Sequence, residues 1–176
     1  MADLELRTSN LEPNLAAIAL GSNLPSPFGE PAANLREAIA RIGAHGHIRA
    51  VSSFYSTAPV GFTDQPDFLN AALLLETELE PLELLRALLA IERAMGRDRA
   101  TAPPKGPRII DLDLLLLDDV VLASARGPQG QPALTLPHPA LAERRFVLQP
   151  LAEIAPAMID PRSGRTIAEL LAKLAE

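Results

Sequence analysis

The sequence predicts an α+β domain with a ferredoxin-like, split βαβ sandwich fold, in which helices pack on one face of a mainly antiparallel sheet. Three observations lead to this prediction. Apolar runs and segments of helical periodicity follow one another in the order strand, helix, strand, strand, helix, strand, with extra C-terminal elements after them. The chain has 176 residues, the length of one ordinary domain. Hydrophobic residues make up 48% of it, which is enough to form a buried core.

Three segments supply the first half of this order. Residues 15–20 are a continuous apolar run ended by Gly21, as expected of a buried strand that enters a turn. Residues 32–42 carry apolar side chains at helical spacing, and Gly43 ends the helix. Residues 48–55 are rich in β-forming side chains and predict the second strand.

The second half follows from three further segments. Residues 68–77 predict a strand with a buried, leucine-rich centre. Pro81 stands near the first position of a helix, and Gly96 ends it. Residues 109–117 are too apolar for a strand with one solvated face. Two shorter elements are expected after these, a strand at residues 134–136 and an amphipathic helix at residues 166–175.

Composition excludes several classes of function. The net charge of -6 and the pI near 5.1 argue against a general nucleic-acid surface, which needs a basic face. The absence of cysteine excludes disulfides, zinc-thiolate sites and thiol catalysis. No apolar run approaches membrane-spanning length and the first residues do not resemble a signal peptide, so we expect a cytoplasmic protein without a membrane partner. We expect residues 1–13 to be a flexible N-terminal extension, residues 14–176 to be a single domain, and the chain to be a monomer.

Two aspartates near the start of the last long strand are the first candidate site. Asp111 and Asp113 are two residues apart, so on a strand they point to the same face with their Cα atoms about 7 Å apart. Ile109, Leu115 and Leu117 are their expected neighbours on that face. Paired carboxylates in apolar surroundings repel each other and lose hydration, and a bound cation removes both penalties. Oxygen ligands without His or Cys favour Mg²⁺, although the spacing alone also fits a strand end hydrated by solvent.

A basic loop just before the aspartates favours the metal site. Arg97, Arg99, Lys105 and Arg108 place four cations close to the pair. Guanidinium groups suit bidentate contacts with phosphate, and a lysine suits a point contact. Carboxylates that bind a metal beside such a loop are typical of phosphoryl transfer. The chain has neither a Walker-type loop nor a Gly-x-Gly-x-x-Gly turn after a strand, and Gly21-Ser22-Asn23 by itself is best interpreted as a simple turn.

Several separate motifs occur in the order found in one known family. They are Ala19-Leu20-Gly21-Ser22-Asn23; Ser52-Ser53-Phe54-Tyr55-Ser56-Thr57-Ala58-Pro59; Gln65-Pro66-Asp67-Phe68-Leu69-Asn70-Ala71; Ile91-Glu92 with Gly96-Arg97; Gly106-Pro107-Arg108-Ile109-Ile110-Asp111-Leu112-Asp113; and Leu136-Pro137-His138 with Arg144-Arg145-Phe146. On these motifs the chain resembles the 6-hydroxymethyl-7,8-dihydropterin pyrophosphokinase family of folate biosynthesis, over residues 17–156. The resemblance implies that the hydroxymethyl oxygen of the pterin attacks the β-phosphorus of ATP, that pyrophosphate moves as a unit, and that AMP leaves.

The resemblance also implies a set of site residues. It implies two Mg²⁺ ions bound by Asp111 and Asp113, with Arg97 and Arg108 as further catalytic residues. The expected pterin-binding residues are Thr57, Ala58, Val60, Phe68, Asn70 and Phe146. The expected ATP-binding residues are Glu92, Arg97, Arg99, Lys105, Arg108, His138 and Arg144, of which Lys105 comes from the basic loop and not from the family motif.

Some of these assignments have a physical reason of their own. Asn70 offers a donor and an acceptor to the edge of a pterin, and a buried amide needs such partners. Phe68 and Phe146 could cover the ring faces, but core packing is the commoner fate of a phenylalanine. Without the resemblance, His138 between two prolines would be interpreted as a surface or capping residue, and Glu92 as a solvated helix residue.

The sequence departs from the family in the basic loop. Pro104 stands where a basic residue is usual, and Lys105 follows it. The loop lacks the aromatic residue of many members, and the prolines should stiffen it. Phe68 also stands where a tyrosine is common. Whether Arg99, Lys105 or Arg108 completes the phosphate clamp is therefore left open.

Two other functions are compatible with these residues. One is a Mg²⁺-dependent phosphotransferase of the same build that acts on another heterocycle. The other is a ferredoxin-like ligand-binding module without catalysis. Product analysis separates the first, because it would release ADP and not AMP, and substitution of the aspartates separates the second.

Overall fold

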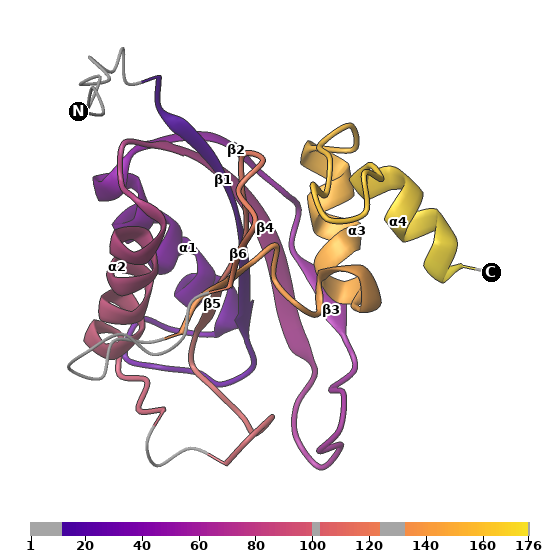
Figure 1. Cartoon of the computed structure of the whole chain (residues 1–176). Helices are drawn as coiled ribbons and strands as arrows, with labels where there is room; N and C mark the ends of the chain where they lie inside the picture. The colour runs from indigo at the N-terminus through magenta and orange to yellow at the C-terminus, as the bar shows by residue number, and fades with distance from the viewer. Residues whose placement is uncertain (1–11, 100–102, 124–132, 176) are drawn as a thin grey trace, which may run out of the picture.

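The computed structural model describes residues 12–99, 103–123 and 133–175, so most of the expected N-terminal extension lies outside the described residues. Their strands are β1 (Asn14–Ser22), β2 (His47–Val51), β3 (Tyr55–Thr57), β4 (Phe68–Thr77), β5 (Asp111–Leu117), β6 (Leu122–Ala123) and β7 (Thr135–Leu136). Their helices are α1 (Pro31–Ile42), α2 (Pro81–Ala94), α3 (Arg145–Ile154) and α4 (Ile167–Leu174), with 3-10 turns at η1 (Gly43–His45) and η2 (Leu141–Glu143). The elements form three layers, with α1 and α2 on one side of the sheet and α3 and α4 on the other (Figure 1).

The main sheet has the order β2-β4-β1-β5, and β3 also pairs with β4. Every pairing in it is antiparallel. The first and third strands of the predicted order, β1 and β4, are therefore central, which confirms the ferredoxin-like α+β fold. The predicted strand at residues 48–55 is divided into β2 and β3, which follow one another along the same edge of β4. The backbone N–H of Ser52 keeps the chain on that edge by donating to the carbonyl of Ala72.

The helices α1, α2 and α4 begin and end close to where the sequence predicts, whereas the bounds of α3 were not predicted. Pro81 stands at the start of α2, and the side chains of Glu80 and Glu83 form a reciprocal capping box at its first turn. Gly96 follows α2 with φ of 101°, a left-handed conformation that favours glycine and ends the helix. Thr166 caps α4 by accepting from the backbone N–H of Glu169. Within the described ranges no helix is long and apolar enough to cross a membrane.

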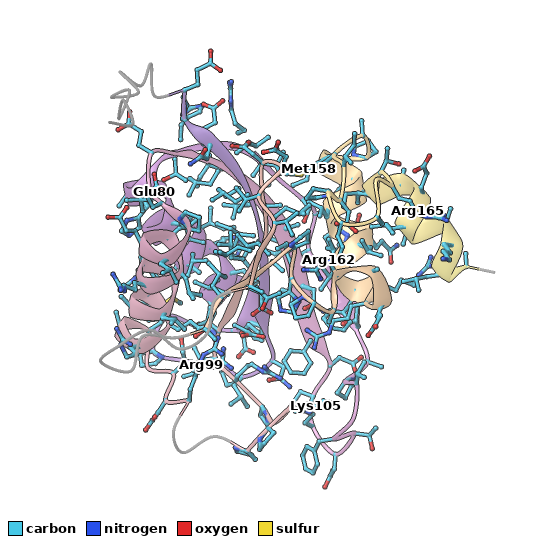
Figure 2. The ribbon with its side chains drawn as sticks, viewed as in Figure 1. Glu80, Arg99, Lys105, Met158, Arg162 and Arg165 are labelled. Carbon is cyan, nitrogen blue, oxygen red and sulfur yellow. The ribbon has the colours of Figure 1, made fainter. Side chains whose placement is uncertain are left out.

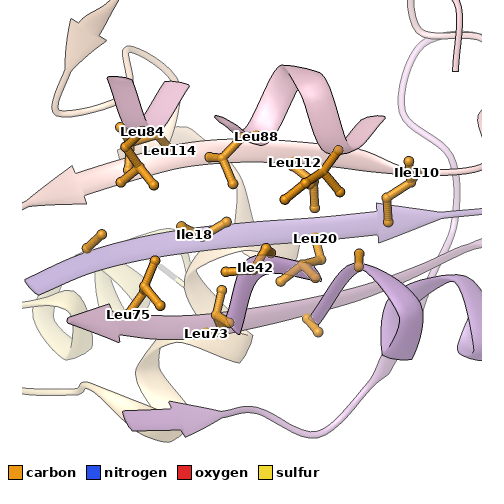
Figure 3. Packing of buried hydrophobic residues seen from close by; sticks show 14 of the residues in the cluster. Ile18, Leu20, Ile42, Leu73, Leu75, Leu84, Leu88, Ile110, Leu112 and Leu114 are labelled. Atoms are coloured by element: carbon orange, nitrogen blue, oxygen red, sulfur yellow. The ribbon is translucent and has the colours of Figure 1, made fainter. Parts of the chain in front are cut away.

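The sheet has a hydrophobic core on each face. The first core lies between the sheet and the helices α1 and α2, and Figure 3 shows its leucines and isoleucines interleaved between strands and helices. The second core contains Leu115 and Leu116 of β5 with Leu148 and Leu151 of α3. The expectation that helices cover one face only is therefore wrong. The central strands carry apolar side chains on both faces. The second face must therefore also be covered, because its apolar side chains are otherwise exposed to water.

A bulge in β5 changes which residues share a face with the aspartates. Ala17 pairs with Leu116 and Ile18 pairs with Leu114, so Leu115 is an extra residue on β5. Leu115 and Leu116 both belong to the second core, whereas Leu117 belongs to the first. The prediction that Leu117 lies on the face of the aspartates is therefore wrong, because a bulge shifts the alternation by one residue.

Ile109 was also expected on the face of the aspartates, and this too is wrong. β5 begins only at Asp111, so Ile109 precedes the strand and its alternation does not apply. The Ile109 side chain packs against the first core instead. The aspartates therefore stand at the start of β5, where the strand enters the sheet beside the end of β1.

Candidate active site

A hollow of about 540 Å³ opens on the face of the sheet that α3 covers. We call it the large hollow. It is lined by Ala19, Leu20 and Gly21 of β1; Thr57, Ala58, Val60, Phe68, Asn70 and Ala71; Lys105, Arg108, Asp111 and Asp113; and Ala140, Glu143, Arg144, Arg145, Phe146 and Val147. All six residues expected to bind a pterin are among these. Segments from four distant parts of the chain therefore meet there because β1, β4 and β5 are neighbours in the sheet.

Asn70 is the most constrained polar residue of the large hollow. It lies on β4 opposite Gly21 of β1 on one side and Tyr55 of β3 on the other. Its Nδ2 donates to Oγ1 of Thr57 at 2.5 Å, which fixes the orientation of the amide. A Cβ atom at Gly21 would lie 3.0 Å from Asn70 Oδ1, so the glycine leaves room beside that oxygen. The sequence interpretation of this glycine as part of a simple turn missed that role.

The two aspartates have different surroundings. Asp111 is neutralised by arginines, with Oδ1 2.5 Å from Nη1 of Arg97 and Oδ2 3.1 Å from Nη1 of Arg108. Nη2 of Arg99 lies farther away, at 3.5 Å from Oδ1. Among the described residues Asp113 makes no ion pair, and burial together with the charge of Asp111 raises its pKa from 3.8 to about 7. Asp113 is therefore the carboxylate that gains most from a cation.

Glu92 lies behind the arginines and is 1% exposed. Its Oε1 accepts from Nη1 of Arg97 at 2.9 Å and from Nη2 of Arg99 at 2.7 Å. The same oxygen accepts from the backbone N–H of Leu112 at 3.0 Å, and Oε2 accepts from Nε of Arg99. In this arrangement Glu92 fixes the two arginines in front of β5 and lines neither hollow, so direct contact with ATP stays a prediction.

A second hollow of about 280 Å³ lies at the outer edge of β5, and we call it the small hollow. It is lined by Leu85 and Leu89 of α2, Arg99, Leu112, Asp113, Leu114, Ala133, Leu134, Thr135, His138 and Pro139. Asp113 is the residue that lines both hollows. Asp113 thus stands between a large hollow with the predicted pterin residues and a small one that combines leucines with Arg99 and His138.

His138 of the small hollow is held by its backbone and by its ring. Its N–H donates to the carbonyl of Leu115 on β5, and Nδ1 accepts from the N–H of Ala140 at 3.1 Å. An Nδ1 that accepts leaves the proton of the neutral ring on Nε2. Burial and the charge of Arg144 lower the pKa of His138 below its ordinary value. His138 is therefore a neutral hydrogen-bond donor and not a surface cation.

The basic side chains predicted to bind ATP are divided between the hollows. Lys105, Arg108 and Arg144 line the large hollow, Arg99 and His138 line the small one, and Arg97 lies behind Asp111. Glu143 and Arg145 also line the large hollow and were not predicted. Arg145 stands within a motif that carried the resemblance, but nothing in its spacing distinguishes it from a surface residue.

Two further polar residues of the site were missed by the sequence analysis. Asn23, which is 2% exposed, donates from Nδ2 to Oε1 of Gln65 and accepts at Oδ1 from the backbone N–H of Arg108. Gln65 in turn donates from Nε2 to the carbonyl of Lys105 at 2.8 Å. Both residues belong to motifs quoted above, but their partners are far away in the sequence and only the fold brings them together.

The donor set of the aspartates suits one class of metal. Among the described residues no group of three or more His, Asp or Glu side chains could hold a metal by itself. Mg²⁺ does not need one, because it usually keeps several waters and takes other ligands from substrate phosphates. Two adjacent carboxylates flanked by arginines fit such an ion when it arrives with a nucleotide.

Comparison with known proteins identifies the family. Residues 17–156 match the family model of 7,8-dihydro-6-hydroxymethylpterin-pyrophosphokinase. A 2-amino-4-hydroxy-6-hydroxymethyldihydropteridine pyrophosphokinase of Methylorubrum extorquens is 44% identical over 161 residues, which is 90% of this chain and 92% of that one. One from Synechocystis is 43% identical over 158 residues, or 89% of this chain and 74% of that one.

A solved structure extends the comparison to the fold. The wild-type HPPK-DHPS of Plasmodium falciparum superposes with a TM-score of 0.72 over 92% of this chain at 16% identity. This chain spans 45% of that longer protein. The superposition supports the same arrangement of sheet and helices. With the family model and the relatives above, it follows that the chain belongs to the 7,8-dihydro-6-hydroxymethylpterin-pyrophosphokinase family.

Proposed function

We propose that this chain transfers the pyrophosphoryl group of ATP to the hydroxymethyl oxygen of 6-hydroxymethyl-7,8-dihydropterin, the activity of its family in folate biosynthesis. The observation that carries the proposal is the position of Asp113, which lines both hollows while all six expected pterin residues line the larger one. A group that passes from one hollow to the other must therefore pass the aspartates.

The large hollow suits the pterin. The Asn70 amide, oriented by Thr57, offers hydrogen bonds to the edge of a flat heterocycle. Phe68 and Phe146 supply aromatic surface for its faces. Ala58 and Val60 complete the wall, and the backbone N–H and C=O groups of this segment can bond to the edge of the heterocycle. The hydroxymethyl group would then point toward the aspartates, which line the same hollow.

The small hollow suits the nucleoside end of ATP. Leu85, Leu89 and Leu134 offer an apolar wall for a base. Arg99 and the neutral His138 can donate to the phosphates where this hollow meets Asp113. Arg108 and Arg144 then face the same phosphates from the large hollow. Cations on both sides of a triphosphate match a reaction in which charge moves along it.

Asp111 and Asp113 are proposed to hold two Mg²⁺ ions that arrive with ATP. Bound there, Mg²⁺ would neutralise phosphate charge and polarise the phosphoryl group for attack. The chain itself contributes the carboxylates, the alignment of the two substrates and the arginines. Arg97 and Arg108 would be released from Asp111 toward the phosphates when a metal takes their place.

The bonds balance without a covalent enzyme intermediate. The hydroxymethyl oxygen forms a bond to the β-phosphorus, the bond from that phosphorus to the oxygen bridging the α-phosphate breaks, and the hydroxyl proton is lost. AMP leaves with the bridging oxygen. The arginines stabilise the charge that develops on the transferred group, and such preorganised contacts are a large part of enzymatic rate acceleration.

The test is a turnover assay with 6-hydroxymethyl-7,8-dihydropterin, ATP and Mg²⁺ in which the nucleotide product is identified. We expect AMP and the pterin pyrophosphate ester. Asp111→Asn and Asp113→Asn should each lower kcat by about 10³-fold or more, as loss of a main electrostatic contact does. Asp119→Asn, in the exposed turn after β5, is the control and should change nothing. ADP as the product would replace this proposal with simple phosphoryl transfer, and unchanged turnover in both aspartate variants would remove the metal site.

We also propose that the chain acts as a monomer. All six expected pterin residues and both aspartates already lie together within one copy of the chain, which supports this proposal. Light scattering at catalytic concentrations tests this, and turnover per chain that rises with protein concentration would contradict it. The cytoplasmic location and the absence of a nucleic-acid partner stay predictions.

A further inference from the structure

Lys105 has an unusual backbone and an unusual position. Its φ is 59°, in the left-handed region that lysine seldom adopts. It belongs to the loop at residues 103–108, which we call the phosphate-side loop. Its carbonyl accepts a hydrogen bond at 2.8 Å from Nε2 of Gln65, in the loop at residues 58–67, which we call the pterin-side loop. Uncommon conformations of this kind persist only where the surroundings fix them.

The side chain of Lys105 crosses the pterin-side loop at its glycine. A Cβ atom at Gly61 would lie 2.9 Å from Cδ of Lys105 and 3.7 Å from its Nζ. Gly61 itself has φ of 89°, so a larger residue would be strained there as well as crowded. Figure 2 shows Lys105 beside this loop and away from Arg99. Lys105 therefore belongs to the phosphate-side loop, and its side chain packs against the pterin-side loop.

Asn23 holds both loops in this relation. Its Nδ2 donates to Oε1 of Gln65 and to the carbonyl of Pro66, each at 3.0 Å. Its Oδ1 accepts from the backbone N–H of Arg108, and its own N–H donates to the carbonyl of that residue. Because Asn23 is buried at the end of β1, the two loops are tied to the sheet and to each other. The network therefore holds the backbone of Lys105, while its exposed side chain lies against Gly61.

The ammonium of Lys105 has no ionic partner among the described residues, and the proposed pterin offers it none. Within the described ranges it makes no ion pair, and Asp111 is already contacted by three arginines. A pterin of the proposed kind is uncharged at neutral pH and offers no anion. Lys105 nevertheless lines the large hollow beside Thr57, Ala58 and Val60. In the proposed complex the phosphates of ATP face Arg108 and Arg144, so the anion left for Lys105 is the pyrophosphoryl group once it is attached to the pterin.

We propose that Lys105 binds the transferred pyrophosphoryl group on the pterin side, and so distinguishes the diphosphorylated product from the pterin substrate. This inference rests on the proposed function. In this proposal Lys105 takes the place of the basic residue that is usual in the family at the position of Pro104. Arg99 stays on the nucleotide side, in the small hollow. A cation that meets its partner only as the group is transferred favours the later stages of the reaction over substrate binding.

The test compares equilibrium binding of substrate and product to the full chain. We expect Lys105→Met, which keeps the length and the apolar stem, to weaken binding of the pterin pyrophosphate ester about 10-fold, in line with one charge-assisted contact. Binding of the unphosphorylated pterin should change less than twofold. Lys105→Arg should keep most of the product affinity. The product affinity of the unmodified chain should fall with added salt more steeply than that of Lys105→Met, because an ionic contact is screened.

A second variant tests the contact between the Lys105 side chain and Gly61. Gly61→Ala should weaken product binding in the unmodified chain but add little in a Lys105→Ala background, since the two residues act through one contact. Thermal unfolding of each variant verifies that it is folded. Equal product affinity of Lys105→Met and the unmodified chain would overturn the inference, and so would equal losses for substrate and product. Failure of the unmodified chain to bind the product at all would instead overturn the proposed function.

Discussion

At the scale of single residues, Asp113 shows how a proposed metal-binding position conflicts with stability. Its carboxylate is partly buried beside Asp111, whose own charge is met by arginines, whereas Asp113 forms no ion pair with any described residue. The raised pKa means that the folded chain without metal binds a proton more tightly at this position than the unfolded chain does. A residue selected for packing alone would not be ionisable at this position. The loss of stability on ionisation of Asp113 therefore points to a cation as the partner of its carboxylate.

Substitution of Asp113 should therefore stabilise the chain in the absence of metal. Because the pKa is about 7 in the folded state and near 3.8 otherwise, the stability that the carboxyl group contributes falls as the pH rises from about 4 to 7. Asp113→Asn should raise the free energy of unfolding by roughly 1–4 kcal/mol at pH 8, and by little near pH 4. Urea unfolding with a chelator at both pH values measures this. Asp160→Asn is the control: Asp160 accepts from Arg162 and Ser163, so its substitution should destabilise.

Glu92 should behave in the opposite way. It is buried and accepts from both Arg97 and Arg99, so Glu92→Gln leaves two arginines with a weaker partner. We expect a loss of about 3 kcal/mol in stability and a higher KM for ATP, with little change in pterin affinity. Glu37→Gln weakens the partly exposed surface pair with Arg41 and should cost less than about 1 kcal/mol. A variant as stable and as active as the unmodified chain would show that Glu92 does not position the arginines.

At the scale of elements, α3 is fastened to the sheet at the end far from the site. Glu153 in its last turn accepts from the backbone N–H and the hydroxyl of Ser53, and these bonds lower its pKa. The start of α3 carries Phe146, while β3, which follows Ser53, carries Thr57. One tie thus sets the distance between two walls of the large hollow.

Glu153→Gln should loosen these walls. We expect the pterin affinity to fall severalfold and the nucleotide affinity to stay the same, because the small hollow contains no residue of α3 or β3. The ionised carboxylate is the stronger acceptor, so the tie is at full strength above the ordinary pKa of Glu153 and weakens as the pH falls through the lowered value. Pterin binding measured by fluorescence in the variant and in Glu169→Gln, on the exposed start of α4, tests this. Equal losses of pterin and nucleotide affinity would contradict it.

At the scale of the whole molecule, the two cores have separate tasks. The core under α1 and α2 supports the sheet from the face away from the large hollow, and the core under α3 and α4 also forms one wall of that hollow. Leu88 and Leu148 are fully buried examples of each. The same loss of packing should therefore have different functional results on the two faces.

Leu88→Ala and Leu148→Ala test this division. Each should lower the free energy of unfolding by about 2–5 kcal/mol, the usual cost of a cavity in a packed core. Only Leu148→Ala should also weaken pterin binding, since α3 carries Phe146 and Val147 into the large hollow. Chemical unfolding gives the stabilities, and titration well below the unfolding midpoint gives the affinities. If both variants lose pterin affinity equally, the cores are not functionally separate.

Much of this protein follows from the sequence by itself. Apolar runs, helical periodicity and the glycines and prolines at their ends determine β1, α1, β4, α2 and β5, because these signals act between near neighbours in the chain. The motifs determine the family, and the Asp111–Asp113 spacing together with the arginines before it predicts a phosphate and metal site. These residues are close in sequence, so a local pattern is enough to bring them together.

The tertiary structure alone decided the rest. The bulge at Leu115, the cover of the second face by α3 and α4, the burial of Glu92 and the tie from Asn23 to Gln65 and Lys105 all depend on contacts between distant segments. The periodicity of apolar residues indicates which side chains are buried, but it does not indicate which other segment of the chain covers them. The division of the site into two hollows that share Asp113 is likewise a property of strand order, since β5 is the edge strand beside β1 and no local signal fixes its neighbour.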